Sequence, residues 1–157
     1  MEGIQRRLQG IHPREGGYEI PYHALYAVHQ RVAATFNKGR VLLAGDSAHV
    51  NNPIGGMGMN GGIHDAMNLT TKLADVWFGR AEPDVFDRYT RQRRKAQVDY
   101  VQAQTIQNKK SLEEKDPVIR RKHLDELRRI SEDVKLHKRF LYRAALIDSL
   151  NSANAVQ

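Results

Sequence analysis

Apolar positions change their spacing along residues 40–77, and this change predicts two successive elements. Residues 40–44 read RVLLA, a short apolar run that opens with a basic residue and ends at the turn pair Gly45-Asp46. Such a run, bounded by turn residues, is typical of a strand that is buried on both faces of a parallel sheet. After Asn60, apolar residues recur three and four positions apart, which predicts a helix. These positions are Ile63, Ala66, Leu69, Leu73 and Val76.

A glycine-rich loop connects the two predicted elements. After Pro53 it contains Gly55, Gly56, Gly58, Gly61 and Gly62. Glycine lets the backbone adopt positive φ angles and approach a ligand closely. The start of a helix presents unpaired N–H groups and the positive end of the helix dipole. The order of strand, carboxylate, glycine loop and helix therefore predicts a site for an anionic or electron-rich cofactor.

The rest of the chain is predicted to be helical, apart from short strands near its start. Residues 4–8 have the pattern of a helix end, residues 10–17 form a loop, and residues 18–20 and 26–36 favour strands. Gly79 is a predicted helix C-cap, and residues 82–84 open a helix that reaches Gln107 or its neighbours. Asp116 and Pro117 start another helix, and a last helical stretch covers residues 140–150. Residues 151–157 are predicted to be a frayed tail.

The composition is that of one domain with a modest core and no disulfides, because the chain has 157 residues and no cysteine. No stretch is apolar enough to span a bilayer or to form a signal peptide, which predicts a cytoplasmic protein. The net charge of +7 would suit an anionic partner. However, the basic residues interleave with apolar stripes and few aromatic residues accompany them. We therefore expect solvated helix faces, with neither a nucleic-acid nor a membrane partner.

The strand–loop–helix unit resembles the second FAD-binding motif of the group A flavoprotein monooxygenases, the para-hydroxybenzoate hydroxylase-like family. That motif has an apolar strand, Gly-Asp, two small residues, His, a proline-containing loop, Gly-x-x-Gly-x-Asn and a helix. Here it reads Gly45-Asp46-Ser47-Ala48-His49, then Pro53, then Gly55-Gly56-Met57-Gly58-Met59-Asn60, then Asp65-Ala66 and Asn68-Leu69. Because many positions must be in register, the match is far more specific than a bare glycine motif.

The resemblance implies an FAD site formed by the strand end, the loop and the helix start. Asp46 would accept hydrogen bonds from the ribityl hydroxyls, or alternatively act as a turn residue that binds nearby backbone N–H groups. The N–H groups of residues 57–60 would face the N1–C2 edge of the isoalloxazine, which is negative in reduced flavin. The alternative is a tight turn with Asn60 as the helix N-cap. The implied contact residues are Gly45, Asp46, Pro53, Gly55, Gly56, Met57, Gly58, Met59 and Asn60.

The resemblance also assigns roles to side chains around this site. Pro53 would direct its carbonyl toward the substrate pocket, although many members have two prolines where this chain has Asn52 and Pro53. His49 is expected to be structural and to pack beneath the loop, and Arg93 with Arg94 to serve packing or ion pairing. No side chain is assigned as a catalytic acid or base. The histidines lack metal-ligand spacing, so no metal site is predicted.

The predicted fold class is α/β: the last strand–loop–helix of an FAD-binding Rossmann-like domain, within a mostly helical fragment. Residues 1–36 would end the substrate-binding domain with a helix end and strands, residues 37–79 would carry the Gly-Asp motif, and residues 80–157 would form C-terminal helices. A buried parallel strand needs neighbours, yet the chain has no βαβ unit and no GxGxxG fingerprint. We therefore expect the C-terminal part of a longer enzyme, with the remaining N-terminal part as its partner.

The reaction implied by the resemblance is hydroxylation of a small, aromatic organic substrate, with O2 as oxidant and NADH or NADPH as reductant. The alternatives are a related flavin-dependent halogenase or reductase, and a non-catalytic helical interaction module that keeps the motif as a scaffold. Alone, residues 1–157 are expected to be inactive and to bind FAD weakly at most. They are also expected to associate with other copies through strand exchange or helix packing.

Overall fold

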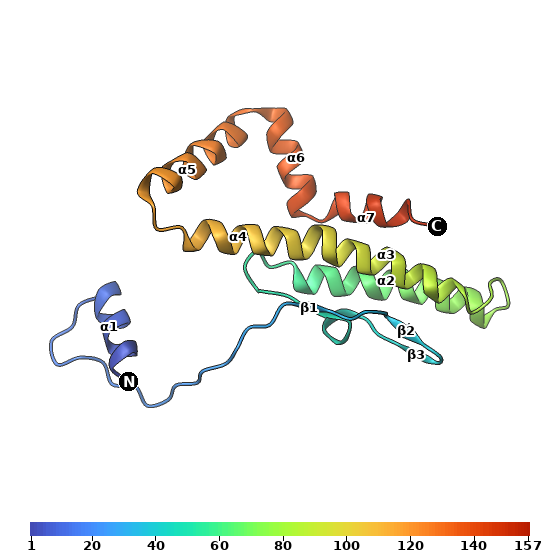
Figure 1. The fold of residues 1–157 in the computed structure, drawn as a ribbon, viewed down its shortest axis with the longest axis horizontal. Coiled ribbons are helices and arrows are strands. Elements are labelled where there is room, and N and C mark those ends of the chain that lie inside the picture. Colours follow the sequence, from blue (N-terminus) through green and yellow to red (C-terminus); the bar gives the residue numbers. More distant parts are fainter.

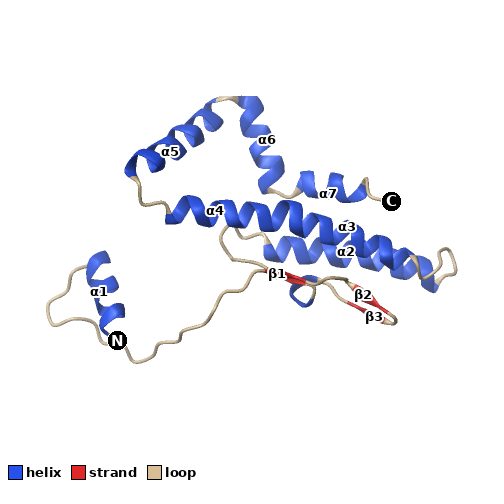
Figure 2. Ribbon diagram, in the orientation of Figure 1, coloured by secondary structure: helices blue, strands red, loops and turns tan.

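Helices carry most of the chain, and only two-residue strands accompany them, in the computed structural model that describes residues 1–157 (Figures 1 and 2). Residues 45–47 form a 3₁₀ turn and residues 97–102 a π-helical turn, here η1 and η2. In chain order the other elements are α1 (Glu2–Ile11), β1 (Arg31–Val32), β2 (Asn37–Lys38), β3 (Val41–Leu42), β4 (His49–Val50), α2 (Gly58–Trp77), α3 (Val85–Ala96), α4 (Ala103–Glu113), α5 (Pro117–Glu132), α6 (Val134–Ala144) and α7 (Ile147–Asn154).

The predicted helix after the glycine loop is confirmed as α2, but it begins at Gly58 and buries a face other than its apolar stripe. Its buried residues are Gly61, Asp65 and Lys72, and this face packs on α3, which lies beside it in Figure 1. The side chains of Ile63 and Leu73 are 52% and 46% exposed. Leu69 of the stripe packs against Phe36, Ala48 and Tyr89, but α3 and η2 take the polar face and leave most of the stripe without cover.

Gly79 ends α2 as predicted. It adopts a left-handed conformation with φ of 67°, and Arg80 N donates to Asp75 O at 2.7 Å. This pattern is a Schellman C-cap, which satisfies the last carbonyl groups of the helix.

One continuous helix is formed by α3, η2 and α4 over residues 85–113. It extends beyond the end predicted near Gln107. The π turn places Gln97 and Val101 in buried positions, and Gln97 lies directly against the first turns of α2. A Cβ atom on Gly61 would come within 2.8 Å of Gln97 Nε2, so a larger residue at this position would displace the Gln97 amide.

The strands form two separate antiparallel pairs, β1 with β4 and β2 with β3. A strand within residues 40–44 is therefore confirmed only for Val41–Leu42, and its prediction as a doubly buried parallel strand is wrong for this chain. Val41 is 62% exposed. The pairing is antiparallel because β2 and β3 form a hairpin across Gly39, whose φ is 58°, and the chain contains no strand that could pair with β3 in parallel.

The other strand predictions succeed only in part. Residues 18–20 form no strand, and of residues 26–36 only Arg31–Val32 is a strand. Residues 22–30 run extended without a strand partner, and Leu25 is 99% exposed. In Figure 1 this extended segment separates α1 from the other helices.

Two small apolar clusters hold the strands and the glycine loop on the helices. Phe36, Ala48 and Tyr89 form the first, and the hydroxyl of Tyr89 donates to Leu43 O at 2.7 Å. Met57, Val101 and Leu146 form the second, which fixes the glycine loop against η2 and the start of α7. Because loop residues pack in these clusters, the helices determine where the glycine loop lies.

The C-terminal helices begin at aspartate caps. Asp116 accepts from Val118 N and starts α5 as predicted, and Asp133 accepts from Lys135 N and starts α6. The single stretch predicted for residues 140–150 is divided between α6 and α7. None of the helices combines the length and the apolar character that a bilayer crossing requires.

The prediction of a frayed tail is wrong. Helix α7 continues to Asn154, Ala153 is 1% exposed, and Gln92 Nε2 donates to Val156 O at 2.8 Å. The tail is ordered because α3 offers polar side chains that hold its main-chain carbonyl groups.

Candidate functional site

An open cleft of about 580 Å³ lies between the strand end, the glycine loop and the start of α2. Five of the predicted contact residues line it: Asp46, Pro53, Gly56, Gly58 and Met59. The structure therefore gathers most of the predicted site, although these residues come from η1, the loop and α2. Gly45, Gly55, Met57 and Asn60 are not among its lining residues.

Asp46 presents an exposed carboxylate to this cleft. It lies in η1, where the side chain of Ser47 makes the local hydrogen bonds, accepting from Ala44 N at 3.2 Å and donating to Ala44 O at 2.8 Å. The Asp46 side chain lies in the turn but binds no nearby backbone N–H group, so its interpretation as a turn residue that binds such groups is wrong. Its oxygens stay available as acceptors for a ligand that carries hydroxyl donors.

The start of α2 supplies hydrogen-bond donors to the same cleft. Its N-cap residue is Met57, and no side chain caps the helix, so the interpretation of Asn60 as the N-cap is wrong. The first N–H groups of a helix have no intrahelical partner and lie at the positive end of its dipole. Gly58 and Met59 thus border the cleft where an electron-rich ligand would be favoured.

The glycine loop has two faces with different neighbours. Met57 points away from the cleft and is 5% exposed in the cluster with Val101 and Leu146. A Cβ atom on Gly55, whose φ is 116°, would lie 2.8 Å from Asn108 Nδ2 of α4. These two residues therefore anchor the loop on the helices, while other loop residues face the cleft.

Pro53 is fixed within this loop by a turn. Its carbonyl accepts a hydrogen bond from Gly56 N at 3.0 Å. A carbonyl oxygen has a second lone pair, so Pro53 keeps one acceptor position at the edge of the cleft that it lines.

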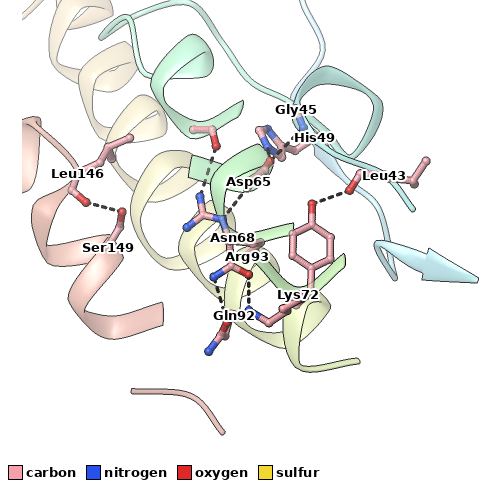
Figure 3. A network of polar contacts seen from close by, with 12 residues as sticks. Leu43, Gly45, His49, Asp65, Asn68, Lys72, Gln92, Arg93, Leu146 and Ser149 are labelled. Atoms are coloured by element: carbon pink, nitrogen blue, oxygen red, sulfur yellow. Dashed lines mark hydrogen bonds and ion pairs between the residues drawn. The ribbon is translucent and has the colours of Figure 1, made fainter. Parts of the chain in front are cut away.

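A buried carboxylate beneath the cleft joins the segments that form it (Figure 3). Asp65 is 0% exposed. It accepts from Arg93 Nε at 2.6 Å, pairs with His49 Nε2 at 2.5 Å and accepts from Gly45 N at 3.0 Å. One side chain of α2 therefore binds the strand end before Asp46, the strand β4 and the helix α3.

Arg93 extends this network to the start of α2, because its Nη2 donates to Gly61 O at 3.4 Å. Arg93 and His49 are 1% and 3% exposed. The ion-pair role predicted for Arg93 and the structural role predicted for His49 agree with these contacts. The sequence assigned no role to Asp65. Its spacing gave no signal, because the face that carries Gly61 and Asp65 is defined only by its packing on α3.

The charge of Asp65 is maintained by its partners. Burial alone would raise the pKa of this carboxyl, but hydrogen bonds from His49 and Arg93 and the positive charge of Arg93 outweigh burial and lower it. Burial likewise raises the pKa of Tyr89 far above its usual range, so this phenol remains neutral. Asp65 and Arg93 therefore form a fixed ion pair at neutral pH.

The lowered pKa of Asp65 predicts a specific acid sensitivity. Since the carboxyl is more acidic in the folded than in the unfolded chain, its stabilisation is complete above the unfolded value of about 3.9 and is lost as pH falls through the folded pKa. Asp65→Asn should flatten this acid limb of the free energy of unfolding, measured by urea titration from about pH 6 downward. Asp125→Asn, at an exposed position of α5, is the control. An unchanged slope in Asp65→Asn would contradict the assignment.

Comparison with known proteins places this geometry among flavin enzymes. A model of the family described as FAD binding domain matches residues 4–104. Para-nitrophenol 4-monooxygenase from a Pseudomonas strain is 39% identical over 119 residues, which cover 76% of this chain and 29% of that protein. A 6-hydroxy-3-succinoylpyridine 3-monooxygenase from Pseudomonas putida is 36% identical over 121 residues, covering 74% and 31%.

A solved structure has a similar fold over nearly the whole chain. The crystal structure of p-nitrophenol 4-monooxygenase PnpA from Pseudomonas putida matches with a TM-score of 0.78 and 32% identity, over 96% of this chain and 38% of that one. The chain therefore spans between 29% and 38% of the length of these three proteins.

Proposed function

The chain belongs to the FAD binding domain family, and from this premise we propose that it forms part of an FAD-dependent monooxygenase that hydroxylates a small aromatic substrate. The observation that carries the proposal is the cleft of about 580 Å³ in which Asp46 lies beside the uncapped start of α2. This cleft combines a carboxylate acceptor with backbone donors. We further propose, from its Gly-Asp motif, that this enzyme belongs to the para-hydroxybenzoate hydroxylase-like group.

The residues present fit FAD by their chemistry. The ribityl chain carries hydroxyl donors, which Asp46 would accept. The N1–C2 edge of the isoalloxazine is electron-rich, and the N–H groups that open α2 would bind it. Gly56 and Gly58 line the cleft without side chains that would fill it, which suits a flat ring system. Gly45 would contribute through its backbone, which Asp65 already holds.

When bound, FAD would supply the electron transfer from NADH or NADPH and the O2 chemistry that oxygenates the substrate. The residues of this chain would bind and orient the ring, and the dipole of α2 would stabilise negative charge at its N1–C2 edge. Pro53 would offer its remaining carbonyl lone pair toward the substrate. The chain itself supplies no catalytic acid or base in this proposal.

The substrate class follows from the relatives. Two proteins similar to this chain are named for a nitrophenol and a hydroxylated pyridine, so we propose a small aromatic substrate. Residues 1–36 would end the substrate-binding domain, residues 37–79 would carry the FAD contacts, and residues 80–157 would form the C-terminal helices. Polypeptide beyond this chain would supply the pyrophosphate site and the missing sheet.

Asp46→Ala is expected to weaken FAD binding by about 1–3 kcal/mol, because ribityl hydroxyls would lose their acceptor at a contact that the bound flavin would bury. The measurement is a titration of the flavin-free, full-length enzyme with FAD. Asp125→Ala, which removes an exposed carboxylate on α5, controls for the change in net charge. Equal FAD affinity in Asp46→Ala and in the control would show that Asp46 does not contact the cofactor.

A further inference from the structure

A second cavity, of about 710 Å³, lies between α2, α3 and the segment that includes α7 and the tail. It shares no lining residue with the cleft at Asp46. Its polar lining includes Lys72, Arg88 and His64 together with the amides of Asn68 and Gln92. No aspartate or glutamate side chain lines it, but Gln157, the last residue of the chain, does, and Arg91 Nε and Nη2 donate to its carbonyl oxygen. The cavity therefore has a positive wall without an acidic side chain.

Lys72 is the unusual member of this wall. It is 7% exposed, and none of the ion pairs of the chain includes it. Its Nζ donates to Asn68 Oδ1 at 2.7 Å and to Gln92 Oε1 at 2.9 Å, as Figure 3 shows. An ammonium group has three donors. Two neutral amides therefore occupy two of them, and the third is left at the cavity.

The surroundings of Lys72 disfavour its positive charge. Burial lowers the pKa of Lys72, and the charges of Arg88 and Arg93 lower it further. The acidic group that opposes this effect is Asp75, which already pairs with Arg80 at 2.9 Å. A buried cation without a counter-ion is costly, and an anion in the cavity would remove that cost.

His64 would contribute a hydrogen bond rather than charge. Burial and the charge of Arg93 lower the pKa of its imidazole, with Asp65 opposing them. The net positive charge at the cavity therefore comes from Lys72 and Arg88. Beside these polar groups, the apolar side chains of Met67, Leu150 and Val156 also line the cavity.

We propose that this cavity is a binding site for a small organic anion, whose oxyanion group contacts Lys72 and Arg88 and whose apolar body lies against Met67, Leu150 and Val156. The site is separate from the cleft at Asp46, so binding here does not depend on flavin.

The test uses calorimetric titration of the purified chain, without flavin, with benzoate, benzamide and inorganic phosphate. Benzoate should bind saturably, and its neutral isostere benzamide should bind at least ten-fold more weakly. Lys72→Met should weaken benzoate binding at least ten-fold, and Arg88→Gln should weaken it to a smaller extent because Arg88 is exposed. Lys110→Met, an exposed lysine on α4, should leave it unchanged.

Thermal unfolding separates binding from folding in these variants. Without anion, Lys72→Met should melt at or above the temperature of the parent chain, because it removes an uncompensated buried charge. Benzoate should raise the melting temperature of the parent and of Lys110→Met equally, that of Arg88→Gln less, and that of Lys72→Met least. Equal binding of benzoate and benzamide, or undiminished benzoate binding by both Lys72→Met and Arg88→Gln, would overturn the proposal. If phosphate bound more tightly than benzoate, the proposed contact of the anion with Met67, Leu150 and Val156 would be wrong.

Discussion

Arg93→Ala is expected to lower the free energy of unfolding of the chain by about 3–5 kcal/mol, the cost of breaking a buried ion pair by removing one partner. The substitution leaves Asp65 fully buried, with only His49 and a backbone N–H group as partners. It also removes the donor to Gly61 O. Since Asp65 accepts a hydrogen bond from Gly45 N, the substitution should also destabilise the strand end beside Asp46.

Urea titration at neutral pH measures this effect, with two further variants as references. Arg94→Ala removes the neighbouring arginine, which is exposed and contacts only Ala33 O among its hydrogen-bond partners; its cost should be within about 0.5 kcal/mol. The double variant Arg93→Met with Asp65→Leu should recover part of the loss, because no uncompensated charge remains. If Arg93→Ala costs no more than Arg94→Ala, the network does not hold the site together.

The second large effect concerns the chain by itself: purified residues 1–157 are expected to bind FAD weakly at most and to associate. The cleft offers contacts for only part of the cofactor, and the pyrophosphate site of this fold lies in a GxGxxG turn that the chain lacks. In addition, α2 exposes Met59, Ile63, Met67, Leu73 and Trp77, which are between 46% and 82% exposed. An exposed apolar stripe of this length favours contact with another chain.

Flavin absorbance and the mass in solution test this expectation together. The double variant Ile63→Lys with Leu73→Lys should reduce association, because it places charges on the exposed stripe. Val118→Lys, at a position of α5 that is 61% exposed, is the matched control and should leave association unchanged. A yellow monomer that carries stoichiometric FAD would contradict the expectation.

The sequence predicted the elements whose signals are local. Gly79 was recognisable as a C-cap because a left-handed residue after a helix requires glycine, and Asp116 because its side chain can bind the next N–H groups. The contact set around the glycine loop was predictable only through the resemblance. Periodicity by itself indicated a cofactor site but could not distinguish residues that face the cleft from Met57, which packs on the helices.

Features that depend on distant neighbours were not predictable. The apolar stripe of α2 indicated a helix correctly, yet it did not reveal that α3 would cover the opposite, polar face. The role of Asp65 required knowing that His49 and Arg93 converge on it from separate elements. The ordered tail likewise depends on Gln92, which lies far from it in the sequence. Each of these outcomes is a tertiary contact between residues that no local pattern connects.

The π turn at residues 97–102 constrains how the length of this chain can vary in evolution. A π turn contains one residue more than the α-helical path needs, and each residue of an α-helix turns the chain by about 100°. Deleting one residue there would restore regular winding and keep α3 and α4 in register, so Thr105 would stay beside Gln30 and Asn108 beside Ile54. Deleting one residue elsewhere in this helix would rotate the residues beyond it by about 100° and break these contacts. The π turn is therefore the place where this helix accepts the loss of one residue.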